Sequence, residues 1–125
     1  MVVCIDPNST IGRIDPKLHG QFIEFLGECI DEGLWVGEDS PTDEFLRLCE
    51  MLGAEPWINI NMLSGTVAEM KDWMEYCNRA QSTDLAKERE ANGHKAPYGG
   101  KYWGIGNEVW AGGGTMTPRT YLNEY

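Results

Sequence analysis

The sequence predicts an α/β fold in which parallel strands alternate with helices, arranged as an incomplete (β/α)8 TIM barrel. Three short apolar segments, residues 21–26, 55–62 and 101–108, are separated by stretches with helical character. Each of these segments carries polar side chains near its end, where parallel barrels gather their functional groups. A complete barrel needs roughly 250 residues. A chain of 125 residues is therefore expected to hold about three core strands with their helices.

A β-hairpin is expected before the barrel strands, as a separate N-terminal domain. Residues 2–5 form a short apolar run, and the Asp, Pro, Asn and Ser of residues 6–10 are typical of a turn. Residues 11–14 are then expected to return as the second strand. We place the hairpin at residues 1–15 and the partial barrel domain at residues 16–125.

Helices are predicted from their apolar stripes and their end signals. The first covers residues 42–52, after a Gly-rich and acidic loop, and its expected buried face is Phe45, Leu48, Cys49 and Leu52. The second opens at the capping box Thr66-Val-Ala-Glu69, and its expected buried face is Val67, Met70, Trp73, Met74 and Cys77. Residues 83–91 are expected to form only a solvated helical turn. Thr117-Pro118 begins a last helix.

Composition and charge exclude several classes of partner. The formal net charge is -10, which repels phosphate backbones and anionic membrane surfaces, so neither nucleic acid nor a membrane is expected as a partner. The four cysteines show no CxxC spacing and are expected to be free thiols. No secretory signal is apparent, so a cytoplasmic location is expected. His19 and His94 have no ligand spacing, and we expect no metal and no cofactor.

Candidate catalytic groups stand at the ends of the three strands. They are Glu24 in the first, Asn59 and Asn61 in the second, and Asn107 and Glu108 in the third. Glycosidic bond cleavage commonly uses two carboxyl groups, one of which is an acid/base that a desolvated, aromatic site keeps protonated. A strand-end Glu can equally be paired with a basic residue or be solvated, and for Glu24 these alternatives stay open. Glu108 is the stronger catalytic candidate.

Aromatic residues around the last strand add to this interpretation. Trp103 and Trp110 flank Glu108, and a Trp ring offers a flat apolar surface for a sugar ring. Trp110 is the better candidate for a sugar contact because it follows the strand and precedes a Gly-rich loop, whereas Trp103 is ambiguous. Trp57 and Trp73 are expected to be ordinary core residues. Asn107 could donate a hydrogen bond to a sugar hydroxyl.

Four blocks of the sequence, which cover most of the chain, resemble glycoside hydrolase family 51, the α-L-arabinofuranosidases. Residues 14–27 resemble the start of that family's barrel, and residues 42–56 resemble the helix that leads into its third strand. Residues 73–78 are similar to the following helix. Tyr102-Trp-Gly-Ile-Gly-Asn-Glu108 is similar to the fourth strand with its Asn-Glu pair. The blocks occur in the family's order.

The resemblance implies a retaining, double-displacement hydrolase that acts on terminal arabinofuranosyl groups of an oligosaccharide or polysaccharide. Glu108 would be the acid/base. Asn107 and Glu24 would hydrogen-bond the sugar hydroxyls, and Glu24 is not the family's nucleophile.

The chain also departs from the family pattern. The family's second strand, with its Arg-Trp/Tyr-Pro-Gly-Gly motif, is missing before Thr42, and the nucleophile and the C-terminal β-sandwich are missing after the fourth strand. Three hypotheses follow: a truncated or internally deleted arabinofuranosidase, a non-catalytic sugar-binding or orphan fragment, and a scaffold that associates through exposed sheet edges, including as a homo-oligomer. The isolated chain is expected to be inactive, since loss of the nucleophile costs orders of magnitude in rate.

Overall fold

The computed structural model describes residues 6–20 and 40–124, and every structural statement below concerns these residues. The chain divides into two compact units, Met1–Leu34 and Trp35–Tyr125, which are described separately. The strands expected at residues 2–5 and 21–26 lie outside the described residues, and so does Glu24. The domain boundary expected after residue 15 stays a prediction.

The first unit contains a turn and a short helix in place of the expected return strand. The backbone N–H of Ser9 donates to the carbonyl of Asp6, as the turn cluster predicts. Residues 11–14 were expected as a strand, and this prediction is wrong: they form no strand pairing, and Ile11 and Ile14 are exposed. The expected neighbour of this strand, residues 2–5, lies outside the described residues. The chain turns instead into the 3-10 helix η1 (Pro16–His19), which Asp15 caps.

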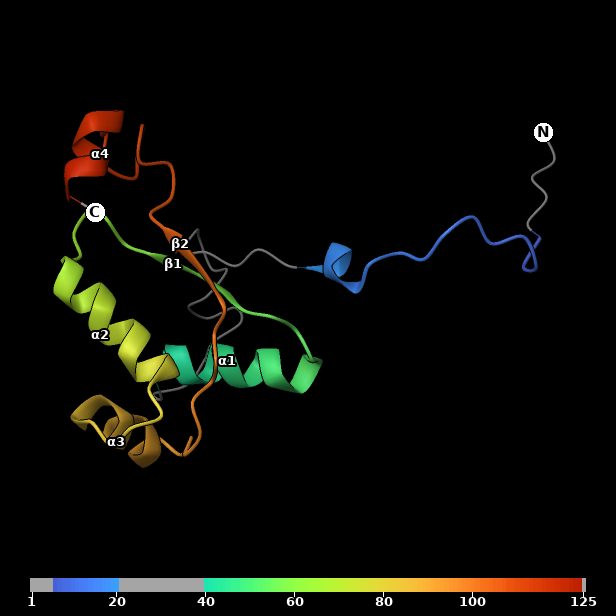
Figure 1. The fold of residues 1–125 in the computed structure, drawn as a ribbon, viewed down its shortest axis with the longest axis horizontal. Helices are drawn as coiled ribbons and strands as arrows, with labels where there is room; N and C mark the ends of the chain where they lie inside the picture. The colour runs from blue at the N-terminus through green and yellow to red at the C-terminus, as the bar shows by residue number, and fades with distance from the viewer. Residues whose placement is uncertain (1–5, 21–39, 125) are drawn as a thin grey trace. The chain divides into compact units, whose positions relative to one another are not determined.

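The second unit alternates helices and strands (Figure 1). Its elements are α1 (Pro41–Leu52), β1 (Trp57–Ile60), α2 (Val67–Asn78), α3 (Asp84–Ala91), β2 (Tyr102–Ile105) and α4 (Pro118–Glu124). β1 and β2 are parallel, with Trp57 opposite Tyr102 and Ile60 opposite Ile105. The α/β class and the parallel pairing are confirmed. Two strands do not make a barrel wall, so the barrel stays a prediction, and the hairpin is not confirmed, since residues 11–14 form no strand.

Both strands are shorter than their apolar segments predict. β1 ends at Ile60 because the Asn61 side chain accepts hydrogen bonds from the backbone N–H groups of Leu63, at 2.9 Å, and Ser64, at 3.2 Å, which turns the chain. β2 ends at Ile105 because the next residue, Gly106, has a φ of 79°. Of the polar residues predicted at strand ends, Asn61, Asn107 and Glu108 therefore lie in the turns that follow, whereas Asn59 lies within β1.

The hydrophobic core lies between the helices and one face of the sheet. One cluster joins Leu46 of α1 and Ile58 of β1 to Tyr76 and Cys77 of α2. A second cluster joins Ile60 and Met62 to Met70 of α2. Since α1 and α2 both pack on Ile58, they cover the same face of the strands, as Figure 1 shows.

The tryptophans divide between the two faces of the sheet. Trp73 packs on the first cluster and contacts Trp103 edge to face, which confirms its predicted core position. Trp57 was also expected in the core, and this prediction is wrong, since it is 65% exposed. Neighbouring side chains of a strand point to opposite faces, so burying Ile58 against the helices turns Trp57 away from them.

The buried face of α1 differs from the predicted stripe. Leu46 is 1% exposed and Leu52 is 71% exposed, so Leu46 takes the core position expected of Leu52, while Cys49 is buried as predicted. Asp43, three residues before Leu46, is also buried. An apolar count cannot anticipate a buried carboxylate, which here finds hydrogen-bond donors on neighbouring segments.

In α2 the predicted capping box is confirmed, but its predicted buried face is correct only in part. The Thr66 hydroxyl accepts from the N–H of Glu69, and the Glu69 carboxylate accepts from the N–H of Thr66. Met70 and Cys77 are buried, whereas Val67 and Met74 are exposed. Val67 is the first residue of the helix and lies beyond the end of β1, so the sheet does not cover it.

α3 is a full helix that packs on α2, rather than the solvated turn expected for residues 83–91. Thr83 caps it, as its Oγ1 accepts from the N–H of Ala86. Ala86 and Arg89 are both buried. Most residues of this segment are charged, which is why a solvated turn was expected. Burial of only Ala86 and Arg89 is nevertheless enough to pack the helix against α2.

Candidate functional site

The candidate site is built on the turn that follows β2. The N–H of Gly106 donates to the carbonyl of Ile60 at 3.1 Å, so the ends of the two strands lie side by side. Gly106 and Glu108 both have positive φ values, 79° and 48°. A non-glycine residue in this region is uncommon and costs of order 1–3 kcal/mol when the surroundings impose it. The chain therefore holds Glu108 in a strained backbone conformation.

Glycines make this geometry sterically accessible. A Cβ on Gly106 would lie 2.5 Å from the Met62 sulfur and 2.6 Å from Cγ1 of Val109. A Cβ on Gly104 would overlap the side chain of Asn59 on the neighbouring strand. Because Gly104 and Gly106 have no Cβ, the end of β2 can lie close to the side chains of Asn59, Met62 and Val109.

Hydrogen bonds fix the remainder of the turn. The carbonyl of Glu108 accepts from the N–H groups of Ala111, at 2.8 Å, and Gly113, at 3.1 Å. The N–H of Met116 donates to the carbonyl of Val109 at 2.6 Å, and both side chains pack against the second core cluster. The Gly-rich segment predicted as a flexible loop is therefore a series of hydrogen-bonded turns. Val109 anchors it, and Glu108 faces outward.

The structure brings three of the four predicted site residues onto this one turn. Asn107, Glu108 and Trp110 are all exposed there. The fourth, Glu24, lies outside the described residues, so its position relative to the turn stays a prediction.

The enclosed, aromatic surroundings expected for Glu108 are not formed by the described residues. Trp103 packs into the core against Trp73 and donates from its ring N–H to the carbonyl of Gly100. It is directed to the helix-covered face because its register partner is Ile58, which is buried there. Trp103 is thus a core residue, and Glu108 is open to solvent.

The asparagines of the β1 segment have different surroundings. Asn61 is engaged by its own turn, since its side-chain amide also donates to the hydroxyl of Ser64 at 2.8 Å. Asn59 is exposed and lies over Gly104 on the face opposite the helices. Asn61 shapes the strand end, whereas Asn59 faces the same space as Trp57.

A buried carboxylate at the helix junction was missed at the sequence level. Asp43 of α1 is 4% exposed and accepts hydrogen bonds from the hydroxyls of Tyr76, at 2.5 Å, and Tyr98, at 2.6 Å. The amide of Asn92 donates to the same carboxylate at 3.4 Å. Asp43 therefore ties α1 to α2 and to the segment that leads into β2. An acidic residue in the first turn of a helix gives no sequence signal for this role.

The electrostatics of the cluster follow from these contacts. Burial alone would raise the pKa of Asp43, but the hydrogen bonds from Tyr76, Tyr98, Ser40 and Asn92 outweigh it and hold the pKa below its usual value. Burial, and next the bond to Asp43, raises the pKa of Tyr76 to about 12. The cluster is therefore a carboxylate facing neutral phenols at ordinary pH.

Arg89 of α3 also holds the segment that leads into β2. Its guanidinium is buried and donates only to backbone carbonyls in the described part of the chain, those of Tyr76, Arg79, His94 and Lys95. These bonds satisfy the N–H donors of its guanidinium without a carboxylate partner. Asp43 and Arg89 together position the backbone that enters β2, and so the strand that carries Glu108.

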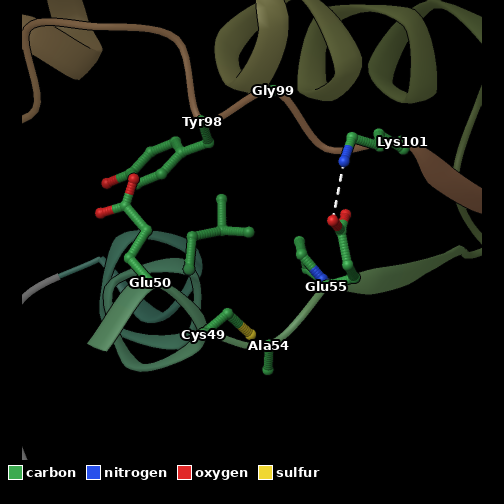
Figure 2. Close-up of a pocket in the computed structure, with 9 residues that line it drawn as sticks. Cys49, Glu50, Ala54, Glu55, Tyr98, Gly99 and Lys101 are labelled. Carbon is green, nitrogen blue, oxygen red and sulfur yellow. Dashed lines mark hydrogen bonds and ion pairs between the residues drawn. The ribbon is translucent and has the colours of Figure 1, made fainter. Parts of the chain in front are cut away.

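A hollow of about 230 Å³ lies at the opposite end of the strands (Figure 2). Pro56 and Lys101, which precede β1 and β2, line it together with Glu50, Glu55 and Tyr98. Figure 2 shows the ammonium of Lys101 bound to the carboxylate of Glu55, at 2.7 Å. Ligands of parallel sheets bind at the carboxyl ends of strands. The hollow is therefore separate from the candidate site.

In residues 6–20 and 40–124, no group of three or more His, Cys, Asp or Glu side chains is placed to hold a metal ion. No helix of that part of the chain has the length and apolar character needed to cross a membrane.

The sequence model of the family described as "Alpha-L-arabinofuranosidase 1 domain" matches residues 34–125, which is most of the chain and includes both strands and the Glu108 turn. The chain belongs to the α-L-arabinofuranosidase family. The resemblance to glycoside hydrolase family 51 is thereby confirmed.

Three relatives show how much of an arabinofuranosidase is present. The chain is similar to α-L-arabinofuranosidase C of Emericella nidulans, 47% identical over 61% of this chain and 16% of the relative. It is similar to the intracellular exo-α-L-arabinofuranosidase of Bacteroides ovatus, 31% identical over 90% of this chain and 34% of the relative. The solved GH51 enzyme of Thermotoga petrophila is 48% identical, with a TM-score of 0.57 over 60% of this chain and 16% of that enzyme. The chain thus spans between a sixth and a third of these relatives.

The Bacteroides ovatus match also bears on the missing second strand. Its alignment runs over 176 residues, whereas this chain has 125, so at least 51 aligned positions of the relative have no counterpart here. The loss of an internal helix and strand before Thr42 stays a prediction.

Proposed function

We propose that this chain carries the acid/base part of an α-L-arabinofuranosidase active site, with Glu108 as the acid/base of a retaining mechanism. The observation that supports it most is the turn after β2, where steric and hydrogen-bond constraints hold Glu108 at a φ of 48° in a family-matched segment. Strain of this kind clusters at functional sites. Glu108 is also the one carboxylate in the turns that directly follow β1 and β2 in the described chain.

Each proposed residue has a separate task. Glu108 donates a proton to the leaving glycosidic oxygen and later removes one from the attacking water, as the acid/base of a retaining glycosidase does. Asn107 hydrogen-bonds a sugar hydroxyl, and Trp110 offers its exposed ring to a sugar face. Glu24 is proposed as a further hydroxyl partner. The substrate is an arabinofuranosyl-containing oligosaccharide or polysaccharide.

A second candidate function is an inactive sugar-binding or orphan fragment. Two observations favour it for the isolated chain. The chain spans only 16% of the Emericella nidulans relative, and Glu108 is exposed, with no enclosing side chain among the described residues. The usual retaining mechanism needs two carboxyl groups.

The activity of the chain itself is tested in an assay of the isolated 125-residue chain on an aryl α-L-arabinofuranoside. Both candidates predict no hydrolysis above the uncatalysed rate, since the described site offers one carboxylate where the usual retaining mechanism needs two. Turnover that Glu108→Gln abolishes would show that the chain supplies a nucleophile of its own and would overturn that expectation. Turnover that survives Glu108→Gln would instead remove Glu108 from the site.

Binding tests the site without turnover. In a titration with methyl α-L-arabinofuranoside followed by NMR, the amides of Asn107 and Glu108 and the ring N–H of Trp110 are expected to shift, while the buried Trp73 signal stays fixed as the internal control. Shifts confined to the hollow near Lys101 would place the sugar at the wrong end of the strands.

A cytoplasmic location is proposed with the function. It is supported by the name of the Bacteroides ovatus relative, which describes an intracellular enzyme. Detection of the natural protein in an extracellular fraction would contradict it.

A further inference from the structure

Gly113 lies against the backbone on both sides of the φ torsion of Glu108. A Cβ on Gly113 would overlap the carbonyl oxygen of Asn107, and it would lie 3.0 Å from the carbonyl carbon of Asn107 and 3.1 Å from that of Glu108. These two carbons are the end atoms of the φ torsion of Glu108. The N–H of Gly113 also donates to the carbonyl of Glu108 at 3.1 Å. Gly113 therefore touches the atoms that define the backbone conformation of Glu108.

We infer that Gly113 is a positioning residue for Glu108. Because Gly113 has no Cβ, the backbone of the Gly-rich turn closes on the peptide between Asn107 and Glu108 and holds Glu108 at its φ of 48°. The carbonyl oxygen of Asn107 is a backbone atom, which cannot turn aside as the end of a flexible side chain can. Any side chain at position 113 must therefore move this peptide or the turn that carries position 113.

The turn that carries Gly113 is tied to the core at both of its ends. Val109 and Met116 pack against the second core cluster, and the N–H of Met116 donates to the carbonyl of Val109 at 2.6 Å. Within the turn, the carbonyl of Ala111 accepts from the N–H of Thr115, at 2.8 Å, and from its hydroxyl, at 3.0 Å. A side chain at position 113 is therefore accommodated by a shift of the peptide before the acid/base candidate rather than by retreat of the turn.

The neighbouring Gly112 provides a comparison within the same Gly-rich segment. A Cβ on Gly112 meets nothing within 4 Å, and Gly112 is exposed whereas Gly113 is half-buried. Neither of these two glycines has a positive φ, so an alanine at either position is free of left-handed backbone strain. Gly112→Ala and Gly113→Ala thus differ in their contact with the peptide between Asn107 and Glu108.

The position of this peptide matters for proton transfer. A general acid must come within about 2.6–3.2 Å of the oxygen that it protonates. A displacement of about 1 Å can lower a reaction rate by about 10²-fold. A shift of the peptide before Glu108 moves its whole side chain, and so weakens proton donation to the leaving oxygen. This step rests on the proposed function of Glu108 as the acid/base.

The first test measures the backbone of the full 125-residue chain by NMR. The φ of Glu108 follows from the coupling between its amide and Hα protons and from its backbone carbon shifts. We expect the same positive φ in the unmodified chain and in Gly112→Ala, and a change beyond the ordinary scatter of about 20° in Gly113→Ala. An unchanged φ of Glu108 in Gly113→Ala would overturn the inference.

A second measurement needs no variant and covers the case in which Gly113→Ala does not fold. Nuclear Overhauser effects between the Hα protons of Gly113 and the backbone protons of Glu108 are expected in the unmodified chain, because the two residues are in contact. Their absence, with the signals of both residues assigned, would show that the turn does not close on Glu108 and would overturn the inference.

Activity is measured in a complete enzyme. Residues 41–124 of this chain are grafted in place of the corresponding segment of the Thermotoga petrophila enzyme, and kcat/KM is determined for aryl α-L-arabinofuranosides with good and poor leaving groups. A good leaving group departs with little help from an acid. Gly113→Ala is therefore expected to lower kcat/KM by about 10- to 10²-fold for the poor leaving group and by less than about threefold for the good one.

Gly112→Ala is the matched control in this assay and is expected to behave like the unmodified graft with both substrates. Equal losses for the two substrates in Gly113→Ala would overturn the inference, since general damage to the fold does not depend on the leaving group.

The positioning role and the proposed function can fail separately. Glu108→Gln in the same graft is expected to show the same dependence on the leaving group, with a larger loss. If Glu108→Gln leaves kcat/KM for the poor leaving group undiminished, the proposed function fails, and the φ measured in the 125-residue chain still decides whether Gly113 holds Glu108. If Glu108→Gln shows the dependence and Gly113→Ala does not, the positioning inference fails and the proposed function stands.

Discussion

At the residue scale, Glu108 is defined more by its backbone than by its side-chain surroundings. The residues that impose its positive φ are local: Gly106 turns the chain, and Val109 anchors the turn in the core. The side chain itself is exposed. The chain thus orients the carboxylate through its backbone conformation, while the described residues leave it exposed to solvent.

Gly106→Ala tests whether this turn is sterically fixed. A Cβ at Gly106 would meet Met62 and Val109 and would sit at a φ of 79°, so we expect a loss of more than about 1 kcal/mol in the free energy of unfolding. Gly112→Ala is the matched control, because a Cβ there meets nothing within 4 Å. Equal urea midpoints for the two variants would show that the turn relaxes freely.

Asp43→Asn tests the buried cluster. The amide keeps the shape but loses the charge that accepts from Tyr76 and Tyr98, so we expect a destabilisation of about 1–3 kcal/mol at pH 7, measured by urea unfolding. Asp72→Asn, an exposed residue of α2, is the control.

The pH dependence of that loss has a defined sign. The pKa of Asp43 is lower in the folded chain than in the unfolded chain, so its stabilisation is complete above about pH 4, the unfolded value, and disappears as the pH falls through the folded value. The difference between the unmodified chain and Asp43→Asn should therefore shrink on acidification from pH 5 to pH 2. A difference that grows in acid would contradict the assigned direction.

At the scale of elements, local signals located the helices and the tertiary contacts decided which faces they bury. The capping box at Thr66 and the glycine at position 53 predict the start of α2 and the end of α1. The apolar stripe of α1 does not predict that Asp43 is buried, because its donors are 33 and 55 residues away in the sequence. Arg89 escaped prediction for a different reason, since its partners are backbone carbonyls, which leave no trace in composition.

Thr66→Ala tests the element for which the sequence signal is most explicit. It removes the hydroxyl that accepts from the N–H of Glu69 and keeps the backbone N–H that donates to the Glu69 carboxylate, and we expect a loss of about 1 kcal/mol in the free energy of unfolding. Ser82→Ala, in the exposed turn before α3, is expected to be neutral. A neutral Thr66→Ala would mean that packing of Met70 and Cys77 alone sets the start of α2.

At the scale of the whole molecule, the sequence predicts the alternation of helices and parallel strands and the position of Glu108. It does not predict that Trp57, on one face of the sheet, is exposed. Trp57 was expected to be an ordinary core residue. In this chain the helices fill only one face, and Trp57 is exposed on the other. Among the described residues, Glu108 likewise has no enclosing groups. The chain spans between a sixth and a third of the relatives compared above.

The central claim, that Glu108 is an arabinofuranosidase acid/base, is tested most directly in a complete enzyme. The matched segment of this chain is grafted in place of its counterpart in the Thermotoga petrophila enzyme, and folding is checked by circular dichroism. The graft is expected to hydrolyse an aryl α-L-arabinofuranoside. Glu108→Gln in the graft is expected to lower kcat/KM by about 10²- to 10⁴-fold on substrates with poor leaving groups. A Glu108→Gln graft with undiminished activity on those substrates would contradict the claim.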